Sequence, residues 1–314
     1  MADIAVLGLF VADIVGRPID ALPPRGTLGL IERIELHIGG NGANTCAALG
    51  KLGISCAAMG KVGADSFGEF LVNAVSRDGA DIRGVVRDPA STTSATIVTV
   101  HSDAERTFLH VAGANATYTP DEVIWEATDG ASIFYVAGLQ LMLAMEGENI
   151  ATVLQEAKRR GMTTVLDTVM NPRSIGWNGL APAMPFLDWA IPSFEEAAQH
   201  TGERTPQAQA EKMKAAGAKN VAIKDGAAGC HIFPATGAAF HVPSFDVAAI
   251  DALGAGDCWA AGFLTGLLHN WPLEKTGLFA NAVGACSVTS LGATTGVKSL
   301  AQTLEMLESS PVVS

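Results

Sequence analysis

A glycine turn leading into an apolar helix carries the clearest chemistry in this sequence. The turn reads Asp251-Ala252-Leu253-Gly254-Ala255-Gly256-Asp257, and small and apolar residues follow it as far as Leu268. Because the first N–H groups of a helix have no partner within the helix, such a turn is suited to bind a phosphate group. A carboxylate at Asp257, in the first turn, suits a general base that accepts the proton of an attacking hydroxyl. The alternative is that Asp257 only caps the helix, as aspartate often does.

Two polar stretches near the N-terminus are candidates for binding a substrate. Asp13 follows an apolar strand predicted over residues 5–9, and open α/β sheets bind ligands beyond the carboxyl ends of their strands. The alternative for Asp13 is an ordinary turn residue. A second glycine turn, Gly39-Gly40-Asn41-Gly42-Ala43-Asn44, opens a helix of small residues. The amides of Asn41 and Asn44 can both donate to hydroxyls and accept from them, which suits a polyol.

The second glycine turn does not fit two common nucleotide-binding motifs. A P-loop requires GxxxxGK[ST], and a dinucleotide fingerprint requires GxGxxG. Thr45 stands where the P-loop needs its first glycine and where the fingerprint needs its third. The sequence therefore disfavours an NAD-dependent oxidoreductase.

Composition and charge restrict the class of protein further. Of the 314 residues, 48% are hydrophobic and 17% are charged, which favours a folded chain with a sizeable core. The net charge of −12 would repel DNA or RNA, so we expect no nucleic-acid partner. No apolar run reaches the ~18 residues that a membrane span requires, so no membrane partner is expected. Five cysteines without CxxC spacing fit a reducing cytosol, and a cytoplasmic protein is the expectation.

The second half of the chain alternates between predicted strands and helices. This alternation is typical of a parallel sheet with helices on both faces. Strands are predicted over residues 133–137, 164–166, 189–191 and 221–223, helices over 146–160 and 206–216, and a loop over 174–188.

Two segments in the first half predict a separate small sheet. Residues 17–37 combine prolines and glycines with an alternating run, and residues 94–111 read as a hairpin. We expect their apolar residues, including Ile34, Leu36, Val98 and Val100, to share one face. Because so small a sheet is not stable alone in water, that face has to be buried on another surface.

Taken together, the motifs resemble those of the ribokinase-like (PfkB) carbohydrate kinases. The turn at 251–257 resembles the family signature D-[TA]-x-G-A-G-D. Residues 39–53 resemble its sugar-binding motif G-G-x-x-x-N-x-A-x-x-L-x-x-L-G, with Cys46 at the position of the alanine. Residues 60–68 match G-x-V-G-x-D-x-x-G, and residues 224–229 resemble a K-x-G-x-x-G turn. The resemblance covers essentially the whole chain.

The resemblance implies a fold and an activity. The fold is a ribokinase-like α/β fold with a mostly parallel central sheet and helices on both faces. It is expected as a single domain over residues 1–314, with a small β-sheet lid formed by about residues 11–37 and 94–111. The implied activity is ATP-dependent phosphorylation of a sugar hydroxyl, and the implied assembly is a homodimer through the lid.

The same resemblance implies roles for individual residues. Asp257 is the base, and the amides of Gly254, Ala255 and Gly256 form an anion hole. The sugar is held by Asp13, Gly39, Gly40, Asn41 and Asn44. ATP is held by Ser193, Lys224, Gly226, Gly229 and Asn281, and Glu196 holds Mg²⁺ through water. A monovalent cation, with K⁺ as the candidate, is held by carbonyl groups of Asp251, Leu253, Ser287, Ser290, Gly292 and Gly296.

Several of these assignments have structural alternatives. Ser193 replaces the family's asparagine, and it would equally serve as the N-cap of a helix. Residues 224–229 also read as a plain hairpin turn, and Asn281 lies in a small-residue helix suited to tight packing. Two other functions also remain open. One is a nucleoside kinase of the same family, with Phe10 and Phe108 covering the base. The other is a non-catalytic regulator that binds a sugar or a nucleotide, against which the intact Asp257 argues.

Overall fold

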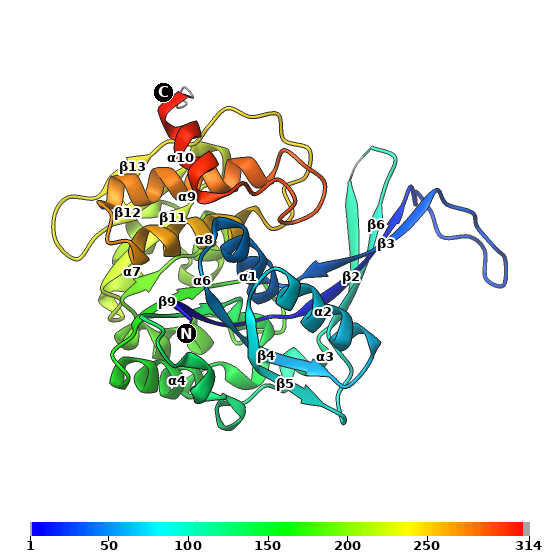
Figure 1. The fold of residues 1–314 in the computed structure, drawn as a ribbon, viewed down its shortest axis with the longest axis horizontal. Coiled ribbons are helices and arrows are strands. Elements are labelled where there is room, and N and C mark those ends of the chain that lie inside the picture. Colours follow the sequence, from blue (N-terminus) through cyan, green and yellow to red (C-terminus); the bar gives the residue numbers. More distant parts are fainter. Residues whose placement is uncertain (1, 104, 310–314) are drawn as a thin grey trace.

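The computed structural model describes residues 2–103 and 105–309, and its main element is a nine-stranded sheet (Figure 1). The strand order is β13-β12-β11-β10-β9-β8-β1-β4-β5. The strands are β1 (Ile4–Gly8), β4 (Cys56–Gly63), β5 (Asp81–Asp88), β8 (Ile133–Ala137), β9 (Thr163–Asp167), β10 (Trp189–Ala190), β11 (Asn220–Lys224), β12 (Cys230–Phe233) and β13 (Phe240–Val242). Neighbouring strands from β5 to β11 are parallel, and β12 and β13 extend the sheet antiparallel.

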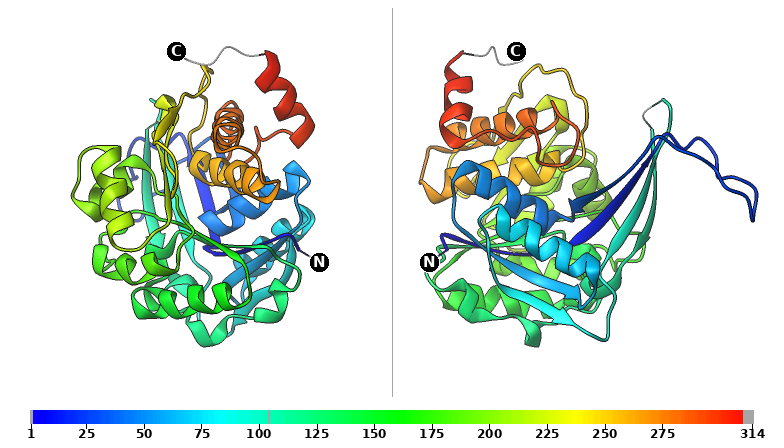
Figure 2. Two further views of the ribbon diagram at one scale, coloured as in Figure 1. Left: turned by 90° about the vertical axis from the view of Figure 1, so that its left-hand side faces the viewer. Right: turned by 45° about the vertical axis from the view of Figure 1, so that its right-hand side comes forward.

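Helices cover both faces of this sheet (Figure 2). One face packs against α1 (Asn41–Leu52), α2 (Ser66–Arg77), α8 (Ala255–Leu268), α9 (Leu273–Ser287) and α10 (Leu300–Ser309). The other packs against α4 (Glu148–Arg159), α5 (Trp177–Leu180), α6 (Phe194–Thr201) and α7 (Pro206–Ala215), and the short α3 (Gly113–Ala116) precedes β8. Strands buried on both faces are largely apolar, as in β1, where Ile4 and Val6 enter one core and Ala5 and Leu7 the other. Within the described ranges, no helix combines the length and apolar character of a membrane span.

A second, four-stranded sheet, here called the small sheet, projects from the body (Figure 1). Its order is β3-β2-β6-β7, from β3 (Arg33–Gly39), β2 (Val11–Arg17), β6 (Ala95–Val100) and β7 (Arg106–Val111). The prediction of a separate sheet from these two parts of the chain is confirmed.

The predicted single apolar face of the small sheet is wrong. Leu36 pairs with Ile14, and Ile34 pairs with Gly16, so these side chains point to one side. Val98 pairs with Val15. Val15 follows Ile14 directly on β2, so its side chain points to the opposite face of the sheet. Val98 and Val100 therefore face away from Ile34 and Leu36. The sequence shows the alternation within each strand, but only the pairing register fixes which strands' faces coincide.

The predicted loop over residues 174–188 is also wrong in part. Residues Trp177–Leu180 form α5, and Ala181–Phe186 form a 3₁₀ helix. Gly176 precedes α5 with a positive φ, and a proline stands in the first turn of the 3₁₀ helix, where no N–H is required. Gly176 and Pro182 thus mark the starts of two short helices, while Gly179 and Pro185 lie inside them. The predicted strands and the two long helices of this half occur within one or two residues of their expected limits.

Candidate active site

Asp257 lies in the first turn of α8, buried in the body of the protein. The turn that delivers it depends on Gly254, whose φ of 72° lies in the left-handed region that favours glycine. A Cβ atom at Gly254 would also stand 2.5 Å from the Cβ of Ala293. The turn therefore fixes the N-terminus of α8, with its dipole, beside the carboxylate. The N–H group of Ala255 makes one long hydrogen bond, 3.3 Å, to the carbonyl of Ala252.

The two asparagines of the second glycine turn meet Asp257 directly. Asn41 Nδ2 donates to Asp257 Oδ1 at 2.7 Å, and Asn44 Nδ2 donates to Asp257 Oδ2 at 2.8 Å. Burial raises the pKa of Asp257, although Asn44, Lys224 and Asn41 act in the opposite direction. The Oδ1 atom of Asn44 is buried and has no hydrogen-bond partner among the described residues. An unsatisfied acceptor beside the carboxylate fits a hydroxyl group of a ligand.

Lys224 forms a buried ion pair that the sequence did not predict. Its Nζ lies 2.5 Å from Asp167 Oδ2, and the hydroxyl of Tyr135 lies 3.3 Å from the same oxygen. Burial raises the pKa of Asp167 to about 7 even though Lys224 opposes this shift. Burial disfavours the Lys224 ammonium, but Asp167 and Glu196 outweigh it and raise its pKa.

The ion pair is also close to the glycine turn, because a Cβ built on Gly256 would stand 3.7 Å from Lys224 Nζ. The ammonium therefore lies near the N-terminus of α8. Asp167 could have been found by the rule that selected Asp13, since it ends strand β9.

Ser193 and Glu196 form a helix cap as well as lying near the buried charges. Glu196 N donates to Ser193 Oγ at 3.2 Å, and Ser193 N donates to Glu196 Oε2 at 2.9 Å. Thr168 Oγ1 donates to the same Oε2 at 3.0 Å, which places Glu196 beside the end of β9. In the part of the chain that the structure describes, no three His, Cys, Asp or Glu side chains cluster as a metal site. Mg²⁺ commonly binds through one or two carboxylates, waters and the phosphates of a substrate, and Glu196 is the carboxylate predicted for it.

Asn281 is committed to the fold. Its Oδ1 accepts a hydrogen bond from Trp259 Nε1 at 2.7 Å, and its Nδ2 donates to the carbonyls of Val242 and Pro243. The structure thus favours the packing alternative for this residue.

Gly226 and Gly229 lie in the turn between β11 and β12, which is a hairpin.

Asp13 lies on β2 at the base of the small sheet and is 8% exposed. Burial raises its pKa to about 6, with Thr96 and His37 acting in the opposite direction. Gly39 pairs with Val11 on the neighbouring strand, and a Cβ there would stand 2.1 Å from Asp13 Oδ2. Gly39 and Gly40 therefore form a turn without side chains beside this carboxylate.

The loops predicted to hold a monovalent cation lie close together. Asp251 accepts hydrogen bonds from Leu253 N and Gly292 N, each at 2.9 Å. Gly296 lies against the carbonyl of Ser287, and Ser290 belongs to the loop between these residues. A residue that the sequence gave no reason to select, Arg106 of the small sheet, pairs with Asp251 at 2.8 Å. The side chain of Asp251 is thus already opposite one positive charge.

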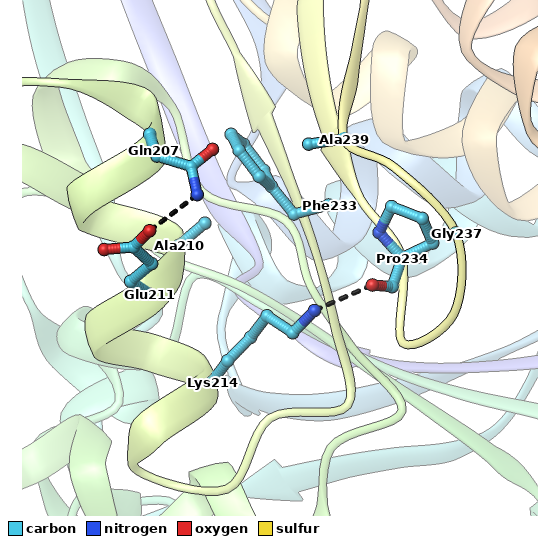
Figure 3. Close-up of a pocket in the computed structure, with 8 residues that line it drawn as sticks. All are labelled: Gln207, Ala210, Glu211, Lys214, Phe233, Pro234, Gly237 and Ala239. Atoms are coloured by element: carbon cyan, nitrogen blue, oxygen red, sulfur yellow. Dashed lines mark hydrogen bonds between the residues drawn. The ribbon is translucent and has the colours of Figure 1, made fainter.

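A separate surface pocket of about 320 Å³ lies between α7 and the β12–β13 hairpin (Figure 3). Gln207 donates to Glu211, and Lys214 donates to the carbonyl of Pro234 (Figure 3). Each of these polar groups therefore already has a hydrogen-bond partner within the protein. None of the predicted site residues lines it.

The body of the protein therefore combines a buried carboxylate, a helix N-terminus and a lysine, and the small sheet adds a second carboxylate. These are the parts of a site for transferring a phosphoryl group to a hydroxyl. The pfkB family of carbohydrate kinases matches residues 1–300, and the chain belongs to this family. Its members are ATP-dependent phosphotransferases that act on sugars.

One relative of similar sequence is such a kinase, and two solved structures share the fold of this chain. The ribokinase of Haemophilus influenzae is 28% identical over 312 residues, which cover 97% of this chain and 98% of that one. A ribokinase of Arabidopsis thaliana, solved with ribose and ATP, superposes with a TM-score of 0.83 at 22% identity, covering 99% of this chain and 100% of its own. A ribokinase homologue of Escherichia coli, solved with ATP and Mg²⁺, has a TM-score of 0.83 at 21% identity, covering 98% and 99% of the two chains. The ribokinase-like fold predicted from the sequence is confirmed.

Proposed function

We propose that this protein transfers the γ-phosphoryl group of ATP to a sugar hydroxyl, with Asp257 as the general base. The observation that carries this proposal is the position of the buried Asp257 carboxylate at the N-terminus of α8, bonded to Asn41 and Asn44. A carboxylate whose pKa is raised by burial accepts a proton more readily than an ordinary one.

The proposed reaction is a direct in-line displacement. The hydroxyl oxygen attacks the γ-phosphorus, the bond to the bridging oxygen of ADP breaks, and Asp257 takes the hydroxyl proton. The amides of Gly254, Ala255 and Gly256 and the ammonium of Lys224 stabilise the charge on the transferred group. Mg²⁺ neutralises the phosphates when bound, and Glu196 would hold it through water. Positioning and charge stabilisation account for most of the rate because little covalent chemistry falls to the protein.

Sugar binding is assigned to residues of the small sheet and of the body. Asp13 accepts hydrogen bonds from hydroxyls, while the bare backbone at Gly39 and Gly40 leaves room for the ring. The unsatisfied Oδ1 of Asn44 accepts one more hydroxyl hydrogen. The nucleoside kinase alternative requires Phe10 and Phe108 to cover the base. Phe10 is fully buried in the core, so only Phe108 is left for this role.

A coupled ADP-release assay with Mg·ATP tests the proposed function. The panel contains D-ribose, D-fructose, 2-dehydro-3-deoxy-D-gluconate and adenosine, with Asp257→Asn as the inactive control. We expect one sugar to raise ADP release well above the rate without acceptor. A response to adenosine alone would favour the nucleoside kinase, and no response to any acceptor from a wider sugar set would contradict the proposal.

We also propose that K⁺ binds at the carbonyls of Asp251, Leu253, Ser287, Ser290, Gly292 and Gly296. The support is that hydrogen bonds and packing bring these loops together. Initial rates measured in KCl against tetramethylammonium chloride at equal ionic strength test it. A rate that is the same in both salts would remove the cation from the mechanism.

The small sheet is proposed to act as a lid over the sugar and to join two copies of the chain. Its face opposite Asp13 exposes Ile34 (69%), Leu36 (40%), Ile97 (50%), Leu109 (60%) and Val111 (49%). An isologous contact would bury this apolar face on an identical face of a second copy.

A further inference from the structure

One ion pair connects the small sheet to the loop that precedes α8. Arg106 is the first residue of β7, and its Nη2 lies 2.8 Å from Asp251 Oδ1. The Asp251 side chain is only 5% exposed and that of Arg106 is 23% exposed. A carboxylate this deeply buried is costly without a partner, so the position of the small sheet matters to the loop.

The Asp251 carboxylate also joins two parts of the body. It accepts hydrogen bonds from Leu253 N and from Gly292 N. Leu253 is followed directly by Gly254, and Gly292 by Ala293, the residue against which Gly254 packs. Arg106 is therefore bound to the carboxylate that holds both sides of the glycine turn.

A second residue of the small sheet approaches the same place. A Cβ built on Gly292 would stand 3.9 Å from Nδ1 of His37, which lies on β3. The opposite edge strands of the small sheet, β3 and β7, thus both reach the loops around Asp251.

We propose that Arg106 is a positioning residue for phosphoryl transfer: with the small sheet in the position that the structure shows, its guanidinium engages Asp251 and holds the Gly254–Gly256 turn in its anion-binding shape. This inference rests on the proposed function. In this proposal the small sheet has two effects. It covers the sugar, and it completes the anion hole, which is formed only when the sheet is in place. Binding of a sugar and readiness to transfer phosphate are then coupled through one ion pair.

The small sheet provides a matched control for this arginine. Arg33 lies on β3 and pairs with Glu35 of the same strand at 3.3 Å. Its side chain is 56% exposed. Arg33→Gln removes the same charge from the same sheet without touching the loop at Asp251.

Hydrogen–deuterium exchange of the unliganded protein tests the coupling without any substrate. In Arg106→Gln we expect faster exchange over residues 250–256 and 290–296 than in the wild type or Arg33→Gln. Unchanged exchange in these two segments, or faster exchange confined to the small sheet, would overturn the proposal. This readout remains decisive even if no acceptor in the panel is phosphorylated, so failure of the proposed function and failure of this inference are distinguishable.

Kinetics with the panel acceptor of highest rate give the second test. Arg106→Gln should lower kcat about tenfold, a usual size for coupling between two sites. The KM for ATP should change less than twofold, and Arg106→Lys should recover part of kcat. The double variant Arg106→Gln/Asp251→Asn should be no slower than the slower single variant, because the two residues act as one unit. Additive losses, or a kcat for Arg106→Gln equal to that of Arg33→Gln, would contradict a positioning role.

Discussion

The glycine turn around Asp257 and the small sheet around Asp13 both carry a buried carboxylate that we propose to act on a ligand, yet their surroundings differ. Asp257 is enclosed by helices α1 and α8 and accepts two side-chain hydrogen bonds from α1. Asp13 lies on a four-stranded sheet that projects from the body and exposes a row of apolar side chains on its other face. The proposed base is thus held in the core, while one proposed sugar-binding carboxylate lies on a sheet that stands out from it.

The largest effect is expected on the body side of this comparison. Asp257→Asn should keep the fold, because an amide fills the same space and Asn44 can turn its unpartnered Oδ1 toward the new NH2 group. It should lower kcat by ~10² or more, as loss of a general base usually does. The wild-type kcat should fall as the pH drops through the raised pKa of Asp257, since the protonated carboxyl cannot accept a proton. Stopped assays from pH 5 to 8 measure both effects. A folded Asp257→Asn protein with near-normal kcat would remove this residue from the mechanism.

A smaller effect, on a different kinetic constant, is expected at Asp13. Asp13→Asn should raise the KM for the sugar about 10- to 100-fold, because each hydrogen bond to a charged group is worth roughly 1.5–3 kcal/mol. The KM for ATP should stay within about twofold, since Asp13 is assigned to the sugar. In the wild type the KM for the sugar should rise as the pH falls below about 6. Equal changes in both KM values would mean that the two regions do not divide the work as described.

The same variant should also alter stability in a defined direction. Because folding raises the pKa of Asp13 from 3.8 to about 6, the folded state disfavours its charge, and stability falls as the pH rises through this window. At pH 7.5, Asp13→Asn should therefore raise Tm by a few degrees. Scanning calorimetry at pH 7.5 and at pH 4 measures this, with the difference expected to shrink at the lower pH. A lower Tm at pH 7.5 would show that the Asp13 carboxylate stabilises the fold.

The smallest effect on turnover is expected at the outer face of the small sheet. Ile97→Glu places a charge in the proposed contact between two copies and should shift the protein from dimer to monomer, because a buried unpaired charge is costly. The change in kcat should be less than about threefold, since the side chain points away from Asp13. Light scattering at micromolar concentration is the measurement, and Leu22→Glu, in the exposed loop beyond β2, is the control. A wild-type monomer, or a dimer that survives Ile97→Glu, would contradict the proposed contact.

The sequence predicted the body side of the site better than the small sheet. Gly254 and Asp257 could be identified because a positive-φ glycine and a helix N-terminus leave a local pattern. The partner of Lys224 was missed, since a buried pair between two strands depends on sheet order and not on spacing along the chain. Arg106 was missed for the same reason, because it meets Asp251 only through the arrangement of the small sheet. The prediction that Val98 and Val100 share a face with Ile34 was wrong, because the pairing register between two segments cannot be read from the sequence of either one alone.

The measurement that tests the central claim most directly is detection of the product. Wild type and Asp257→Asn are each incubated with Mg·ATP and the panel of acceptors, and the sugars are then analysed by mass spectrometry. Equal binding of Mg·AMP-PNP by the two proteins establishes that both are folded and take up the nucleotide. The account predicts one sugar with the mass of one added phosphoryl group in the wild type and at most a trace in Asp257→Asn. A phosphorylated sugar formed equally by both proteins, or ADP released by the wild type with no phosphorylated acceptor, would contradict it.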